Sequence, residues 1–208
     1  MRSLLLATTN RHKLEEFRAI FADLSFHLLS LRDLHLDLDV EETGTTFAEN
    51  ARLKALAYAH ASGMLTLADD SGLEIDALGG APGVYSARFL HPDASYEERF
   101  RVILERLRGL PMEQRSARFC CVITLAEPAG YCRSVTGVVE GVIADAPRGE
   151  HGFGYDPIFL LPERGKTMAE LMPEVKNSIS HRGRAARLAR ALLEEWPLSS
   201  SSHQEQSE

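Results

Sequence analysis

The chain has 208 residues, of which 44% are hydrophobic and 25% charged, a composition typical of one globular protein with a single substantial core. Acidic residues outnumber basic residues 30 to 23, and the formal net charge of −7 argues against a broad basic surface for nucleic acid or anionic lipid. Three cysteines are too few for a disulfide framework, and no segment approaches the roughly 20 apolar residues of a membrane span, so we predict a cytoplasmic protein with neither nucleic acid nor membrane as a partner.

The first third of the chain alternates apolar segments with polar loops. It is predicted to form a strand at 4–7, a helix over 14–24, a strand at 34–40, a helix at 47–62 and a strand at 65–68. Thr46 is the predicted cap of the second helix, because Glu49 follows three residues later. The strand at 65–68 runs directly into an acidic motif.

The rest of the chain is predicted to contain a helix at 96–107, strands at 117–125 and 131–143, and a helix at 181–196 with Ser180 as its cap. Because two hairpin-like strands interrupt the alternation of strands and helices, the pattern predicts an α/β fold with a mixed sheet. We expect one domain over residues 1–196 and a disordered, serine-rich tail over 197–208.

A polar loop follows the first predicted strand and opens the first helix. Its residues are Thr8, Thr9, Asn10, Arg11, His12 and Lys13. Backbone N–H groups and a lysine at a helix start favour an anion such as phosphate. The loop lacks the glycines of a Walker P-loop, and helix capping by the asparagine explains the same residues without a ligand. Both interpretations stay open on these residues.

Two adjacent aspartates, Asp69 and Asp70, follow the strand at 65–68 and precede Ser71. Neighbouring carboxylates attract a hard cation such as Mg²⁺, and Glu42 follows another predicted strand and could supply a third oxygen ligand. An Asx turn ending at Gly72 is the alternative, because these residue types are common in turns.

Two further motifs carry groups that suit a nucleotide base. The segment 152–157 places Phe153 and Tyr155 between glycines and beside Asp156, so the aromatics either pack in the core or stack on a ligand. The segment 176–182 brings basic residues to a helix N-terminus, where they oppose the helix dipole. A carbonyl or phosphate ligand explains those basic residues, and so does solvation of a surface turn.

Six motifs in order along the chain resemble the inosine triphosphate pyrophosphatase family, also called dITP/XTP pyrophosphatases. The motifs are ATTNxxK at 7–13, ETGxxFxENAxxK at 42–54, ADDSGL at 68–73, GGAPGVYSAR at 79–88, GFGYDPIF at 152–159 and ISHR at 179–182. The resemblance implies an elongated α/β fold of two lobes around a central mixed sheet, with the active-site cleft between the lobes. It also implies a homodimer and Mg²⁺-dependent hydrolysis of ITP, dITP and XTP to the nucleoside monophosphate and pyrophosphate.

The resemblance also assigns roles to individual residues. Asp70 is the implied general base, and it holds Mg²⁺ together with Glu42 and Asp69. The implied substrate-binding residues are Thr8, Thr9, Asn10, Arg11, His12, Lys13 and Lys54 for the phosphates, Ser71 beside the metal, Phe153, Gly154, Tyr155 and Asp156 for the base, and Lys176, His181 and Arg182 for its 6-oxo group.

Donors aimed at a 6-oxo group predict rejection of adenine, because its 6-amino group would leave buried donors unpaired. Guanine also carries a 6-oxo group, so these residues do not predict how GTP is discriminated. Two alternatives remain at this stage. One is a Maf-like nucleotide pyrophosphatase with a different base preference, and the other is a non-catalytic nucleotide-binding module.

Overall fold

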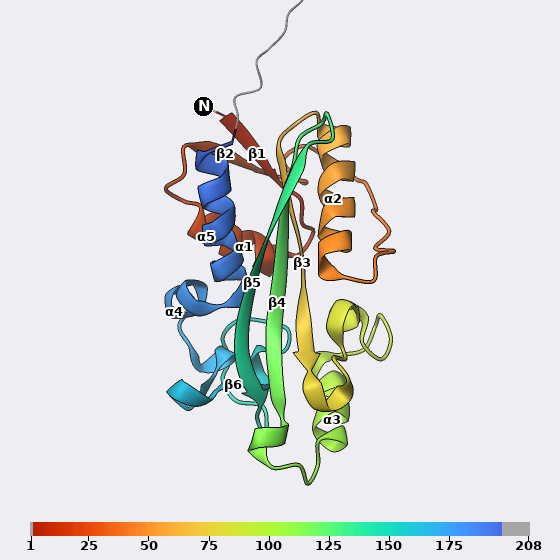
Figure 1. Cartoon of the computed structure of the whole chain (residues 1–208), viewed down its shortest axis with the longest axis vertical. Helices are drawn as coiled ribbons and strands as arrows, with labels where there is room; N and C mark the ends of the chain where they lie inside the picture. The colour runs from red at the N-terminus through yellow and green to blue at the C-terminus, as the bar shows by residue number, and fades with distance from the viewer. Residues whose placement is uncertain (1, 197–208) are drawn as a thin grey trace, which may run out of the picture.

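One seven-stranded mixed sheet forms the centre of the molecule in the computed structural model, which describes residues 2–196 (Figure 1). In spatial order its strands are β2 (Phe26–Ser30), β1 (Arg2–Leu6), β3 (Thr66–Ile75), β4 (Ser116–Ala126), β5 (Cys132–Ile143), β6 (Phe159–Leu161) and β7 (Lys166–Thr167). β1 is parallel to β2 and β3, and the other neighbours are antiparallel. The predicted α/β class with a mixed sheet is confirmed, while the tail predicted at 197–208 lies outside the described residues.

Helices cover both faces of this sheet (Figure 1). The α-helices are α1 (Arg11–Ile20), α2 (Phe47–Ser62), α3 (Tyr96–Arg106), α4 (Pro173–Ile179) and α5 (His181–Glu194). Successive residues of β1 alternate between the faces: Leu4 packs with α1 and α5, and Leu5 packs with α2. None of the helices in the span 2–196 is long and apolar enough to cross a membrane.

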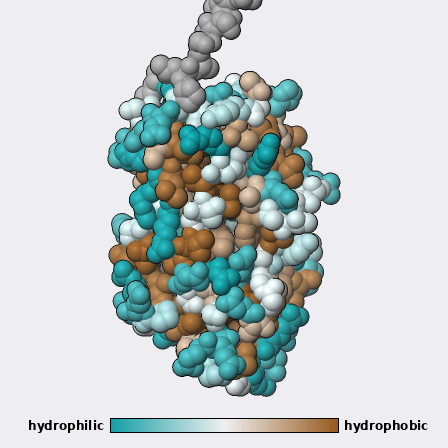
Figure 2. Space-filling model, viewed as in Figure 1, coloured by the Kyte–Doolittle hydropathy of each residue, from teal (hydrophilic) through white to brown (hydrophobic). Residues whose placement is uncertain are grey.

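The molecule is elongated because β3, β4 and β5 run through two separately packed halves (Figure 1). In one half, α1 and α5 pack on β1 and the adjoining ends of β3 and β4, around Phe17 and Phe21. In the other half, α3 packs with β6 and the opposite strand ends, around Phe100 and Phe159. On the face shown in Figure 2, hydrophobic and hydrophilic residues are interspersed, as on most protein surfaces.

The strand predicted at 34–40 is wrong. The alternating residues Leu34, Leu36, Leu38 and Val40 are half-buried against the α2 side of the sheet, so the alternation identified the packed side chains correctly. However, His35 has a φ of 49°, which interrupts an extended run, and the Leu38 carbonyl accepts a hydrogen bond from Tyr58 Oη at 2.7 Å instead of pairing in a ladder. The strand of this region is β2, which precedes the predicted segment.

β3 is longer than its apolar residues predict. The strand expected at 65–68 continues to Ile75, and Asp69 and Asp70 lie within it, opposite Ile123 and Val122 of β4. The alternative of an Asx turn ending at Gly72 is therefore wrong. Because residues of a strand point alternately to the two faces, the two aspartates face opposite sides of the sheet.

Candidate active site

The site forms where β1 stops and β3 continues. β1 pairs with β3 only at Thr66 and Leu67, and after Leu6 the chain turns into the polar loop and α1. The loop therefore leaves the sheet beside Asp69. A cavity of about 710 Å³ lies along this part of β3, a size within the usual range for small-molecule sites.

Most of the residues predicted for the site line this cavity. They are Thr8, Thr9, Asn10, Lys13, Glu42, Lys54, Asp69, Asp70, Ser71, Phe153, Gly154, Tyr155, Asp156, Lys176, His181 and Arg182. Arg11 and His12 lie outside the lining: the exposed Arg11 pairs with Glu15 at 2.8 Å, and the ring of His12 stacks on Phe153. The helix-cap interpretation of Asn10 is also correct, since its side chain accepts from the Lys13 N–H at 3.2 Å.

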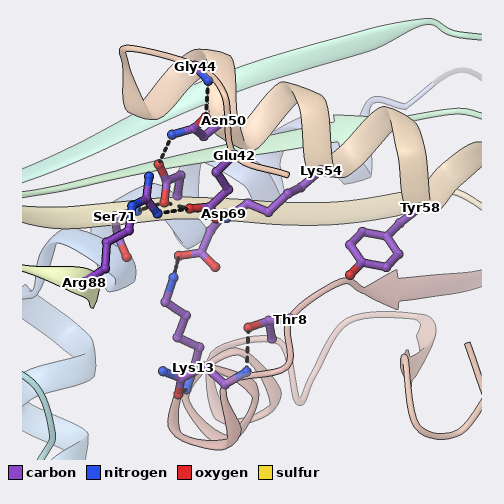
Figure 3. Close-up of polar contacts among 12 residues, drawn as sticks. Thr8, Lys13, Glu42, Gly44, Asn50, Lys54, Tyr58, Asp69, Ser71 and Arg88 are labelled. Atoms are coloured by element: carbon purple, nitrogen blue, oxygen red, sulfur yellow. Dashed lines mark hydrogen bonds and ion pairs between the residues drawn. The ribbon is translucent and has the colours of Figure 1, made fainter. Parts of the chain in front are cut away.

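Asp69 and Asp70 are bound by side chains from opposite faces of β3, and Figure 3 shows Lys13 directed at Asp69. Asp69 accepts from Lys13 Nζ at 2.9 Å and lies 3.5 Å from Arg182 Nη2. Asp70 accepts from Asn50 Nδ2 at 3.1 Å and lies 3.6 Å from Lys54 Nζ. Each aspartate is therefore buried with a different set of basic and amide partners.

These environments drive the pKa values of the two carboxyl groups apart. Burial raises the pKa of Asp70, and the nearby Glu42 carboxylate raises it further against the opposing charge of Lys54. Burial also tends to raise the pKa of Asp69, but the charges of Lys13 and Arg182 outweigh it and hold that pKa well below its usual value. Asp69 is therefore a permanent anion, and Asp70 is the carboxylate better suited to accept a proton.

Glu42 forms the outer edge of this acidic group. Its carboxylate accepts from Lys54 Nζ at 2.5 Å and from Arg88 Nη1 at 3.2 Å. Burial tends to raise the pKa of Glu42, and the hydrogen bond and charge of Lys54 more than reverse this. Since Lys54 also lies near Asp70, one ammonium group is shared between two carboxylates.

The oxygen ligands suit a hard divalent cation. Within residues 2–196, no three His, Cys, Asp or Glu side chains gather as a ready-made metal site. Mg²⁺ needs no such cage, because it is usually held by one or two carboxylates together with substrate phosphates. Asp69 Oδ1 is buried and has no hydrogen-bond partner in the described structure, which leaves an oxygen available. Asp70 and Glu42, which share Lys54 on one side of β3, are the carboxylates that fit Mg²⁺ in the presence of a polyphosphate, and Asp69 offers its free oxygen from the other side of the strand.

Asn50 supports the side chain of Asp70, and the sequence assigned it no role. It is fully buried in α2, and besides donating to Asp70 it accepts from the Gly44 N–H at 2.8 Å. It therefore links the loop that carries Glu42 to the side chain of Asp70, and Figure 3 shows its contact with Gly44. Its place in the motif at 42–54 was visible in the sequence, but its partners were not.

Replacing Asn50 with alanine is expected to destabilise the fold by about 1–3 kcal/mol, because the buried Asp70 carboxylate and the half-buried Gly44 N–H lose their partner. We expect slower turnover as well, because Asp70 loses the hydrogen bond that orients it. Urea unfolding and steady-state kinetics measure the two effects. Gln114→Ala removes an exposed carboxamide and serves as the control. Unchanged stability and turnover in Asn50→Ala would contradict the assignment.

The 3₁₀ segment η2 (Gly83–Arg88) is joined directly to β3 by a hydrogen bond. Ser86 Oγ accepts from the Leu73 N–H at 2.9 Å and donates to the Gly83 carbonyl at 2.6 Å. A Cβ at Gly72 would collide with both oxygens, so only glycine allows this close approach. The Ser86 carbonyl in turn accepts from Tyr155 Oη at 2.9 Å, which ties the loop at 152–156 to the same body.

A buried ionic network forms the other end of the cavity. Lys176 Nζ lies 2.5 Å from Asp156 and 2.8 Å from Glu16, and Arg182 lies 2.6 Å from Glu16 and donates to Ser71 Oγ at 2.9 Å. Glu16 therefore joins both cations, a role that sequence reasoning missed. The available signal was its position three residues after Lys13, on the same face of α1.

His181 is held by ring stacking. Its imidazole lies 4.7 Å from the ring of Phe119, with the planes inclined by 17°. Burial, with the charges of Arg182 and Lys176, lowers the pKa of His181 well below its usual value, so the ring is neutral. Its Nδ1 is buried without a hydrogen-bond partner in the described structure. A neutral ring with a free nitrogen suits recognition of a polar base edge.

Comparison with known proteins finds similar chains over almost the whole described length. A model of the Ham1 family matches residues 4–192. The chain is 52% identical to the dITP/XTP pyrophosphatase of Geobacillus kaustophilus over 185 residues, which cover 89% of this chain and 91% of that protein. It is 50% identical to the dITP/XTP pyrophosphatase of Geobacter sulfurreducens over 188 residues, 90% of this chain and 94% of that protein. A solved HAM1 protein from Coxiella burnetii is similar with a TM-score of 0.86 and 44% identity, over 94% of this chain and 100% of that one.

Proposed function

Because the chain belongs to the Ham1 family, we propose that it hydrolyses noncanonical purine nucleoside triphosphates, namely ITP, dITP and XTP. The products are the nucleoside monophosphate and pyrophosphate, so the enzyme removes these nucleotides from the pool. The observation that carries this function is the aspartate pair on β3, which lines one cavity together with Lys13 and Lys54.

Asp70 and the two lysines have separate roles in the proposed reaction. Water attacks the phosphoanhydride between the α and β phosphates, and we assign Asp70 as the base that accepts the proton of that water. The bond to the bridging oxygen breaks, and that oxygen leaves with pyrophosphate. Lys13 and Lys54 reach the cavity as ammonium groups that offset the charge of the phosphates.

Mg²⁺ is the proposed metal, held by Asp69, Asp70 and Glu42. When bound, it neutralises charge on the polyphosphate. Lys54 supports this assignment, because in the structure its ammonium group already occupies a position shared by Glu42 and Asp70.

The base is proposed to bind at the opposite end of the cavity. Lys176, His181 and Arg182 are the proposed donors to the 6-oxo group, and Phe153 is the proposed stacking platform. The donors support selectivity for hypoxanthine and xanthine over adenine, since a 6-amino group would leave buried donors unpaired.

Replacing His181 with alanine is expected to lower the preference for ITP over ATP by about tenfold, the effect of one buried hydrogen bond. The ratio of kcat/KM for the two substrates is the measurement. His27→Ala, which removes an exposed histidine on β2, is the control. A ratio equal to that of the wild type would show that His181 does not read the 6-oxo group.

Steady-state hydrolysis of ITP, dITP, XTP, GTP and ATP with Mg²⁺, scored for pyrophosphate and for phosphate, tests the function directly. Pyrophosphate release from the first three substrates is the expected result. Strong hydrolysis of dTTP or UTP would favour the Maf-like alternative, and binding of ITP without products would favour a non-catalytic module.

We further propose that residues 1–196 act as one catalytic domain, that two copies form a homodimer, and that the enzyme works in the cytoplasm. Exposed aromatic and aliphatic side chains at Tyr85 and Leu90 support an interface beside η2. Analytical ultracentrifugation of the purified protein measures the assembly, and a monomer at micromolar concentration would contradict the dimer.

A further inference from the structure

Three side chains crowd the ring of Phe153. Lys176 Nζ lies 4.8 Å from the ring centroid, and the guanidinium carbon of Arg182 lies 5.4 Å from it. The imidazole of His12 stacks on the same ring, with centroids 5.2 Å apart and planes inclined by 13°. A nucleotide base can therefore stack on Phe153 only if one of these three side chains moves away from the ring.

The platform and the two cations are held in place. The Phe153 N–H donates to the Asp156 carboxylate at 2.9 Å, and the same oxygen accepts from Lys176. Lys176 is 3% exposed and Arg182 is 2% exposed, and both are bound to Glu16. These cations cannot leave the ring without breaking buried ion pairs, which is strongly unfavourable.

His12 differs from both cations. It is the second residue of α1, its side chain is exposed, and it lies against Phe153 at the rim of the cavity. An exposed side chain changes rotamer on a picosecond to nanosecond timescale. His12 is therefore the neighbour that moves when a base arrives.

The ring distance shows how far it has to move. Two rings with a base between them lie about 7 Å apart, since each stacked contact takes about 3.5 Å. The present centroid distance between His12 and Phe153 is 5.2 Å. A shift of about 2 Å therefore admits a base, and the two ring planes are already nearly parallel.

We propose that His12 is the second wall of the purine subsite and closes over a base stacked on Phe153. This inference rests on the proposed function and deepens it. The resemblance assigns the whole segment 8–13 to the phosphates, whereas the structure turns His12 toward the base end of the cavity. Stacking on an aromatic ring stabilises any purine, so His12 contributes to affinity for all purines. The donors to the 6-oxo group remain responsible for the preference for hypoxanthine and xanthine over adenine.

In His12→Ala, the KM for ITP is expected to rise about tenfold with kcat unchanged, because the lost contact is made equally in the ground and transition states. The KM for XTP should rise by the same factor. His12→Phe keeps a ring at this position and is expected to restore the wild-type KM. His60→Ala removes an exposed histidine in the last turn of α2 and is the matched control.

Inorganic tripolyphosphate carries no base and separates the two possible contacts of His12. As a competitive inhibitor of ITP hydrolysis, it is expected to bind the wild type and His12→Ala equally. Lys13→Met is the positive control, and it should weaken tripolyphosphate because the lysine lies at the phosphate end of the cavity.

Three results would overturn the assignment: an unchanged KM in His12→Ala, a lowered KM, or a loss of tripolyphosphate affinity as large as the loss for ITP. The second would mean that the imidazole only competes with the base, and the third that it binds phosphate. Failure of the wild type to release pyrophosphate from ITP would instead contradict the proposed function, so the two failures are distinguishable.

Discussion

Replacing Asp70 with asparagine is expected to lower kcat for ITP by about three orders of magnitude, within the range for loss of a general base. The amide cannot accept the proton of the attacking water, and it is a poorer ligand for Mg²⁺. It keeps an oxygen that accepts from Asn50, so the buried site stays packed. Pyrophosphate release under saturating ITP is the measurement.

Folding of the Asp70→Asn variant is checked by its urea midpoint, because a loss of activity through unfolding would carry no mechanistic information. Asp76→Asn is the matched control. Asp76 begins the turn after β3, is exposed, and accepts from Ser116 and Arg118. A folded Asp70→Asn enzyme that releases pyrophosphate at the wild-type rate would remove Asp70 from the reaction.

Replacing Glu16 with glutamine is expected to destabilise the protein by about 3 kcal/mol, the low end for breaking a buried ion pair by removing one partner. Lys176 and Arg182 would each lose a carboxylate within 2.8 Å. Urea unfolding at neutral pH is the measurement. Glu15→Gln, the exposed neighbour on the same helix, is the control and should change little.

The contribution of Glu16 to the free energy of unfolding should decrease as the pH falls. Burial tends to raise the pKa of Glu16, but the charges of Arg182 and Lys176 lower it below the usual value of 4.5. An acid with a lowered pKa stabilises the fold fully above its unfolded pKa and loses this contribution as the pH falls through the folded pKa. The stability difference between wild type and Glu16→Gln should therefore shrink below about pH 4.5. A difference that grows on acidification would contradict this assignment.

The strands and helices with strong periodicity were predictable. The helices around Phe100 and Ala186 and the hairpin of β4 and β5 agree with prediction within a few residues. β2 was missed because its five residues lack clear alternation, and 34–40 was taken for a strand because its leucines alternate. Alternation of apolar and polar residues predicts which side chains are buried. Whether the segment forms a strand also depends on whether a neighbouring strand is available for backbone hydrogen bonds.

Most residues that line the cavity were predictable from the sequence, and the residues that support them were not. The motifs placed the aspartates, the lysines and the base loop in one cavity. Glu16, Asn50 and Phe119 were missed because each acts on another side chain, across 166, 20 and 62 residues of sequence respectively for Arg182, Asp70 and His181. Such contacts depend on which faces of α1, α2 and β4 converge after folding.

Hydrogen bonds hold η2 and the loop at 152–156 against β3, so they set the distance between the two ends of the cavity. The proposed stacking platform Phe153 and the proposed general base Asp70 lie on segments that are joined through the hydrogen bonds of Tyr155 and Ser86. Under the proposed function, a nucleotide whose purine stacks on Phe153 would reach Asp70 at a set distance along its length. This spacing would select the anhydride between the α and β phosphates, because the two anhydrides are chemically similar.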